Sequence, residues 1–133
     1  MMTTFTVKTT AREQMIDVTA LVHQAVDASG VRDGLAVCFV PHTTAGITIN
    51  ENADPSVSAD ILDRLRRQIP QQDNYRHAEG NSDAHIKASL IGSSIQVLVA
   101  DGRLVLGVWQ GIFFCEFDGP RTRQLIVKVG KLA

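Results

Sequence analysis

Apolar residues near the start of the chain change from strand spacing to helix spacing. Residues 5–10 (FTVKTT) are rich in β-branched and aromatic side chains, which predicts a strand. The next apolar residues recur at i, i+3, i+4, i+7 and i+8: Val18, Leu21, Val22, Ala25 and Val26. This spacing predicts a helix, whose start Asp17 or Thr19 would cap and which Gly30 would end.

The middle of the chain predicts two adjacent strands followed by two helices. Residues 34–40 (GLAVCFV) are apolar on both strand faces, so we expect them to run through the centre of a sheet. Residues 44–51 alternate between apolar and polar, which indicates a half-buried strand that can line a site. A helix should begin at Asp54-Pro55 and stop at Pro70, and a shorter one should begin at residues 81–83 and end at Gly92. The buried stripe of the first helix would be Val57, Ile61, Leu65 and Ile69.

The last third of the chain is rich in predicted strands. They are Ile95–Val99, Leu104–Val108, Ile112–Phe117 and Gln124–Val129. The pairs Asp101-Gly102 and Asp118-Gly119 are typical of tight hairpin turns. We therefore predict an α+β fold: a single compact domain over residues 1–133, with a mixed or antiparallel sheet and about three helices.

Composition and charge narrow the class of protein. The chain has 13 Lys+Arg against 14 Asp+Glu, so it lacks the basic excess of a nucleic-acid-binding domain. No apolar run approaches the roughly 18–20 residues of a membrane span, and the N-terminus lacks the pattern of a signal peptide. Cys38 and Cys115 lie singly in apolar runs, which indicates buried thiols. We expect a cytoplasmic protein without a nucleic-acid or membrane partner.

Three histidines are the first candidates for chemistry. The chain has no GxxxxGK[ST], GxGxxG, GxSxG or HExxH motif. His42 follows the predicted central strand, His77 lies in the loop before the short helix, and His85 lies in the first turn of that helix. If these elements converge, three imidazoles can hold a zinc ion and leave one position open for water. The alternative is that they are ordinary polar residues on separate elements.

Carboxylates and arginines lie near the histidines in sequence or at the last strand. Glu51 follows a strand end rich in Thr and Asn, so it is a candidate general base or partner of a metal ligand. Asp60 is a second candidate, although it can equally pair with arginines along its own helix. Arg121 and Arg123 would share one face of the last strand and could clamp a phosphate, with a surface role as the alternative.

Three long motifs follow one another along the chain: HTTAGITINENADPSV, YRHAEGNSDAHIKASLIGSS and GRLVLGVWQGIFFCEFDGPRTR. Together and in this order, they resemble the YjbQ family, also described as a secondary thiamine-phosphate synthase family. Val108 and Leu98 depart from the usual pattern, which has Thr and Pro at these places. The resemblance implies a compact α+β domain that forms a homotrimer, with a polar site that contains the motif histidines. The activity it implies is weak thiamine-phosphate synthesis, which joins a pyrimidine methyl diphosphate to a thiazole phosphate with loss of pyrophosphate.

Residue types and resemblance together define one predicted site. The metal ligands would be His42, His77 and His85, holding a divalent ion such as zinc. The catalytic residues would be Glu51, Asp60 and His85. Thr43, Thr44, Asn50, Lys87, Arg121 and Arg123 would bind a phosphorylated small molecule. Two other functions stay open, because imidazole ligands suit metal-activated water and because binding needs no catalysis. These are a metal-dependent hydrolase and a non-enzymatic homotrimer that binds a metal or an anion.

Overall fold

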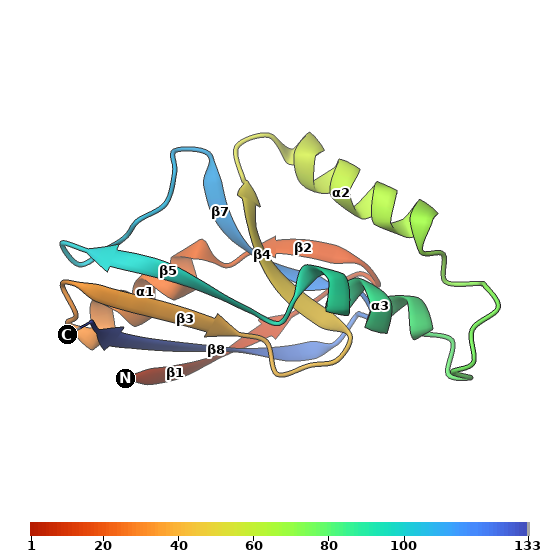
Figure 1. The fold of residues 1–133 in the computed structure, drawn as a ribbon, viewed down its shortest axis with the longest axis horizontal. Coiled ribbons are helices and arrows are strands. Elements are labelled where there is room, and N and C mark those ends of the chain that lie inside the picture. The colour runs from red at the N-terminus through yellow and green to blue at the C-terminus, as the bar shows by residue number, and fades with distance from the viewer. Residues whose placement is uncertain (133) are drawn as a thin grey trace.

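The computed structural model describes residues 1–132 and contains eight strands and three helices (Figure 1). The strands are β1 (Met2–Lys8), β2 (Gln14–Asp17), β3 (Gly34–Phe39), β4 (Ala45–Glu51), β5 (Ser94–Ala100), β6 (Arg103–Leu104), β7 (Gln110–Glu116) and β8 (Thr122–Lys131). The helices are α1 (Thr19–Ser29), α2 (Pro55–Gln68) and α3 (Ser82–Ile91). The predicted α+β class and the three helices are confirmed.

The strands form two antiparallel sheets. The larger has the order β1-β8-β3-β5-β6, so β3 is central as predicted, and the smaller has the order β2-β7-β4. Helix α1 and the smaller sheet both pack on the inner face of the larger sheet, and the main core lies between these layers. Its largest buried side chains include Phe114, Ile47, Ile112 and Leu125. Strand alternation explains this, because every second residue of β3, β5 and β8 faces inward.

Local signals in the sequence place the helix boundaries correctly. Asp17 accepts the backbone N–H of Thr19 at 2.9 Å and so supports the start of α1, although Val18 occupies the N-cap position itself. Gly30 ends α1 in the left-handed conformation, with a φ of 68°. Asp54 caps α2 by accepting the N–H of Ser56 at 2.9 Å, with Pro55 as the first helical residue.

Several strand predictions differ from the structure. Strand β2 was not predicted, because only Met15 and Ile16 of its four residues are apolar and no alternation can develop over that length. Of the predicted strand Leu104–Val108, only Leu104 lies in a strand, the two-residue β6. The Asp101-Gly102 turn joins β5 to β6 as expected, but Asp118-Gly119 does not form a hairpin. It carries the chain from β7 in one sheet to β8 in the other.

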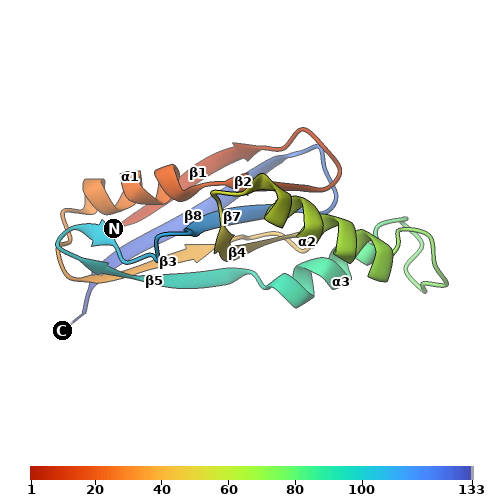
Figure 2. The ribbon, with the colours of Figure 1, turned by 90° about the horizontal axis from the view of Figure 1, so that it is seen from above.

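Two apolar surfaces predicted to be buried are open in the single chain. The outer face of β3 leaves Val37 and Phe39 exposed. The predicted stripe of α2 is only half-buried, because α2 stands off from the sheets (Figure 1). The segment between α2 and α3 forms one end of the molecule, opposite the two termini (Figure 2).

Both cysteines are buried in the core, as predicted. Burial raises the pKa of each thiol to about 12. Neither is a reactive thiol in the folded chain. Separately, none of the helices in the described residues has the length and apolar character needed to cross a membrane.

Candidate functional site

His42 is held by a backbone group of the neighbouring strand. Strand β3 ends at Phe39, opposite Ile126 of β8, so β8 continues beyond the end of its partner. There the N–H of Gln124 donates to Nε2 of His42 at 2.9 Å. The imidazole therefore takes the place of the acceptor that a longer β3 would have offered.

This contact defines which nitrogen of His42 carries the proton. A peptide N–H can only donate, so Nε2 must present a lone pair, and the neutral ring then carries its proton on Nδ1. Burial, and after it the positive charge of Arg123, lower the pKa of His42 below its ordinary value. At neutral pH the ring is therefore an uncharged donor through Nδ1–H.

His42 and His85 line one cavity of about 490 Å³, which we call the histidine cavity. Its walls are His42, Thr43, Ala45, His85, Ala88, Ser89, Gly92 and Ser93. The cavity forms because the end of α3 docks closely on β4, where the N–H of Ile47 donates to the carbonyl of Gly92 at 3.0 Å. Gly46 permits this approach, since a Cβ there would lie 2.7 Å from the same carbonyl oxygen. The fold thus brings two of the three predicted histidines together.

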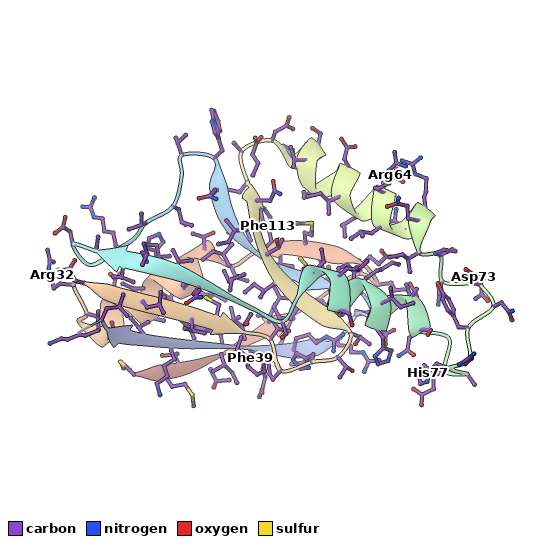
Figure 3. All side chains as sticks on the ribbon, viewed as in Figure 1. Arg32, Phe39, Arg64, Asp73, His77 and Phe113 are labelled. Atoms are coloured by element: carbon purple, nitrogen blue, oxygen red, sulfur yellow. The ribbon has the colours of Figure 1, made fainter. Side chains whose placement is uncertain are left out.

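His77 joins this group from the loop before α3, at the end of the molecule shown in Figure 3. Its ring meets that of His85 edge-on, with 5.3 Å between the centroids, and its Nε2 lies 3.6 Å from Oε2 of Glu79. Across residues 1–132, however, no three His, Cys, Asp or Glu side chains are close enough to hold a metal ion. As arranged in one chain, the three predicted ligands do not fit a metal.

Arg123 belongs to a buried ion pair next to His42. Its Nε donates to Oε1 of Glu116 at 2.8 Å, and its Nη2 donates to Oε2 of Glu116 and to Oγ1 of Thr44 at 2.8 Å. Glu116 also accepts the hydroxyl of Thr9 and the N–H groups of Phe117 and Asp118, at 2.8, 3.1 and 3.0 Å. The pKa of Glu116 is lowered, because these donors, with Arg123 the strongest, outweigh the desolvation of the carboxylate. Arg123 and Thr44 are thus first of all structural partners that fix the chain beside His42.

Arg121 and Lys87 are also engaged in ion pairs. Arg121 is exposed and pairs with Asp118, from its Nη2 to Oδ2 at 2.9 Å. Lys87 is fully buried, with Nζ 2.7 Å from Oδ2 of Asp83 and 3.5 Å from Oε2 of Glu13. The same Asp83 carboxylate accepts two hydrogen bonds from Arg12. Lys87 therefore ties α3 to the segment before β2 and does not face the histidine cavity.

Three predicted site residues lie elsewhere in the single chain. Asn50 and Glu51 are at the opposite end of β4 from Ala45, which six residues of strand place about 20 Å away. Asn50 uses its Oδ1 to accept the N–H of Glu51 at 2.7 Å. Asp60 lines a different cavity of about 570 Å³, which is formed by α2 and by Ile91 at the end of α3. Within one chain these residues do not meet a ligand of the histidine cavity.

Glu116 and Asp83 are the buried groups that the sequence did not reveal. Glu116 sits in an otherwise apolar run, FFCEF, and is fully buried. A charged residue in a core strand needs a partner, so this position was a signal for a buried ion pair. Asp83 enters the sequence prediction only as part of the helix start at residues 81–83, although its spacing of four residues from Lys87 suits an ion pair on a helix.

Comparison with known proteins identifies the family. The family model described as UPF0047 protein YjbQ-like matches residues 3–131. The chain belongs to the YjbQ/UPF0047 family. A UPF0047 protein of Methanocaldococcus jannaschii is 56% identical over 125 residues, which cover 94% of this chain and 91% of that protein. The UPF0047 protein YugU of Bacillus subtilis is 52% identical over 130 residues, which cover 97% and 98%.

A solved structure of the YjbQ/UPF0047 family has the same fold. The protein of Clostridium acetobutylicum is 58% identical and superimposes with a TM-score of 0.95, covering 96% of this chain and 99% of that one. It is described as an uncharacterized conserved protein of the family. The fold implied by the three sequence motifs is therefore confirmed, while the similar proteins are described by family and not by reaction.

Proposed function

We propose that this YjbQ-family protein is an enzyme that binds a phosphorylated small molecule in the histidine cavity. The observation that carries the proposal is the cavity of about 490 Å³ that His42 and His85 line from two different elements. The hydroxyl-bearing residues Thr43, Ser89 and Ser93 line the same walls, although the Ser89 hydroxyl donates to the carbonyl of His85 at 2.9 Å. Imidazole N–H and hydroxyl groups are donors that suit phosphate oxygens, and several convergent donors in a concave site favour a small ligand.

The reaction we propose is a transfer of the thiamine-phosphate synthase type, as the family resemblance implies. A pyrimidine methyl diphosphate would join a thiazole phosphate, and pyrophosphate would leave. Negative charge builds up on the departing pyrophosphate, so donors placed at its oxygens stabilise the transition state. Of the predicted catalytic residues, His85 is the one in the histidine cavity, and we assign it this role.

The assembly we propose is the homotrimer implied by the same resemblance. In one chain Asn50, Glu51 and Asp60 lie outside the histidine cavity, so only contact between subunits can bring all the predicted site residues together. Light scattering on the eluting protein tests this proposal. The expected mass is three times the 14.5 kDa of one chain. A monomer that retains the transferase activity would contradict it.

A metal-dependent hydrolase is the second candidate function, and one observation favours it. His77 links His85 to Glu79, so two imidazoles and a carboxylate follow one another at the edge of the cavity. Since no three donors converge in residues 1–132, a divalent ion would need a rearranged loop or a second subunit. Metal analysis of purified wild-type protein and of His85→Ala tests it. Equal, substoichiometric metal in both would refute the metal hypothesis.

The test of the proposed function uses the purified protein with the two substrates of thiamine-phosphate synthesis. We expect product formation by the wild-type protein and a loss of about a hundredfold or more in His85→Ala, the scale of one lost transition-state donor. His23→Ala is the matched control, since His23 lies on α1 and not in the histidine cavity. Equal activity in His85→Ala and wild type would refute the role of the cavity. Substrate binding without turnover would favour the non-enzymatic alternative.

A further inference from the structure

We propose that His42 serves the histidine cavity as a fixed hydrogen-bond donor, through Nδ1–H, to a phosphate oxygen, and that it is not a metal ligand. The choice of phosphate as the ligand rests on the proposed function. The donor role rests on the contact between Nε2 of His42 and the N–H of Gln124 at 2.9 Å.

The group that orients His42 is itself immobile. Gln124 lies in β8, where it pairs with Thr6 of β1, and β8 pairs with β3 from Ile126 onward. A peptide N–H in a paired strand cannot follow a rotating side chain. The imidazole must therefore adapt to the strand, and the orientation that accepts this hydrogen bond fixes the neutral ring as the Nδ1–H tautomer.

Either way of binding a metal through His42 conflicts with this arrangement. A metal ion at Nε2 would take the lone pair that Gln124 uses and leave that N–H without its acceptor. A metal ion at Nδ1 would require the proton on Nε2, and two N–H donors would then face each other over 2.9 Å. Donation of a hydrogen bond through Nδ1–H leaves the bond between Gln124 and Nε2 intact.

The Nδ1 atom is open to a ligand. No partner for it is found in residues 1–132, and the single buried side-chain polar atom without a partner in that part of the chain is Oδ1 of Asn81. Nδ1 of His42 is therefore accessible to solvent.

The buried ion pair of Arg123 and Glu116 holds the chain next to His42. Nη2 of Arg123 holds Oγ1 of Thr44, two residues from His42, and the charge of Arg123 acts on the imidazole. Glu116 neutralises most of that charge, so the attraction for an anion comes from directed N–H groups more than from net charge. A tetrahedral oxyanion such as phosphate uses directed donors of this kind.

The first experiment compares two amide variants with inorganic phosphate as the probe. The side-chain amide nitrogen of Asn falls near the place of Nδ1 in His, and that of Gln falls near the place of Nε2. We expect His42→Asn to bind phosphate within about threefold of wild type. His42→Gln should bind about tenfold more weakly, because it lacks one hydrogen bond to a charged group. His23→Asn is the control and should bind like wild type.

The second experiment needs no ligand. Long-range ¹H–¹⁵N spectra of histidine-labelled protein should show the proton of His42 on Nδ1, and adding Zn²⁺ should leave both of its nitrogen shifts unchanged. A proton on Nε2, a zinc-dependent shift at His42, or equal losses of phosphate binding in His42→Asn and His42→Gln would each overturn the inference. If wild-type protein binds no phosphate, the proposed function and the anion role fail together. A wrong tautomer beside intact phosphate binding overturns this inference alone.

Discussion

The buried pair of Glu116 and Arg123 gives the sharpest prediction for stability. Arg123→Met keeps an unbranched side chain that matches the aliphatic part of arginine but leaves the Glu116 carboxylate buried without its cation. Breaking a buried ion pair by removing one partner costs about 3–5 kcal/mol. Glu116 keeps three other donors, the hydroxyl of Thr9 and two backbone N–H groups. We therefore expect a loss near the lower limit, about 3 kcal/mol in the free energy of unfolding.

Urea unfolding of wild type and Arg123→Met at several pH values measures this loss. The pKa of Glu116 is lowered in the folded protein, so its contribution to stability is present above its unfolded pKa and disappears as the pH falls through the folded pKa. In Arg123→Met the pKa of Glu116 should rise, because burial is no longer opposed by the guanidinium. The difference between the two proteins should therefore be greatest near neutral pH and shrink in acid.

A double variant separates the unpaired charge from simple loss of packing. Glu116→Gln combined with Arg123→Met removes both charges. The amide oxygen can keep the two backbone N–H bonds that Oε2 accepts, and the amide nitrogen, in the place of Oε1, can donate to the hydroxyl oxygen of Thr9. This double variant should be more stable than Arg123→Met alone at neutral pH, since no uncompensated charge is left in the core. The reasoning is wrong if the double variant gains nothing, or if Arg123→Met costs less than about 1 kcal/mol.

Three further predictions concern other buried or strained positions. Lys87→Met should lower the free energy of unfolding by about 2 kcal/mol. This is less than the cost of leaving a buried charge with no partner, because Asp83 keeps its two hydrogen bonds from Arg12. Lys8→Met, at an exposed position, is the control and should change the free energy of unfolding by no more than about 0.5 kcal/mol in the same urea titration. Gly30→Ala places a Cβ at a φ of 68° and should cost about 1 kcal/mol, which the thermal midpoint reports. Both thiols should resist a colorimetric thiol reagent in the folded protein, since their pKa is about 12, and react on unfolding; fast reaction without urea would contradict their burial.

The sequence predicts most of this fold because its local signals agree with the tertiary structure. Spacing and caps locate all three helices, and the apolar run of residues 34–40 marks the central strand. Strand pairing between distant segments is harder to predict. The Asp118-Gly119 pair has hairpin composition, yet β7 pairs with β2 and β4 while β8 pairs with β1 and β3. Which sheet receives a strand depends on contacts more than a hundred residues away, such as Phe5 opposite Leu125.

The sequence predicts which types of residue form the candidate site, but only some of the residues it names lie there. His42, Thr43 and His85 meet in one cavity because a strand end and a helix converge there, as the pattern suggested. Lys87 is two residues from His85, and a helix turns by about 200° over that distance, so Lys87 faces the opposite side. It is buried against Asp83 instead. Proximity in sequence was thus misleading for a residue on the same helix.

The chemistry of His42 is decided by a residue that no local pattern connects to it. Gln124 lies 82 positions further along the chain, and its contribution is a backbone N–H, which is independent of its side chain. That N–H lacks a strand partner because β3 ends at Phe39 and Pro41 follows within two residues. The length of one strand therefore selects the tautomer of the imidazole at its end. The sequence predicts His42 as a metal ligand, with an ordinary polar residue as the alternative. The register of the sheet instead orients its ring as a hydrogen-bond donor.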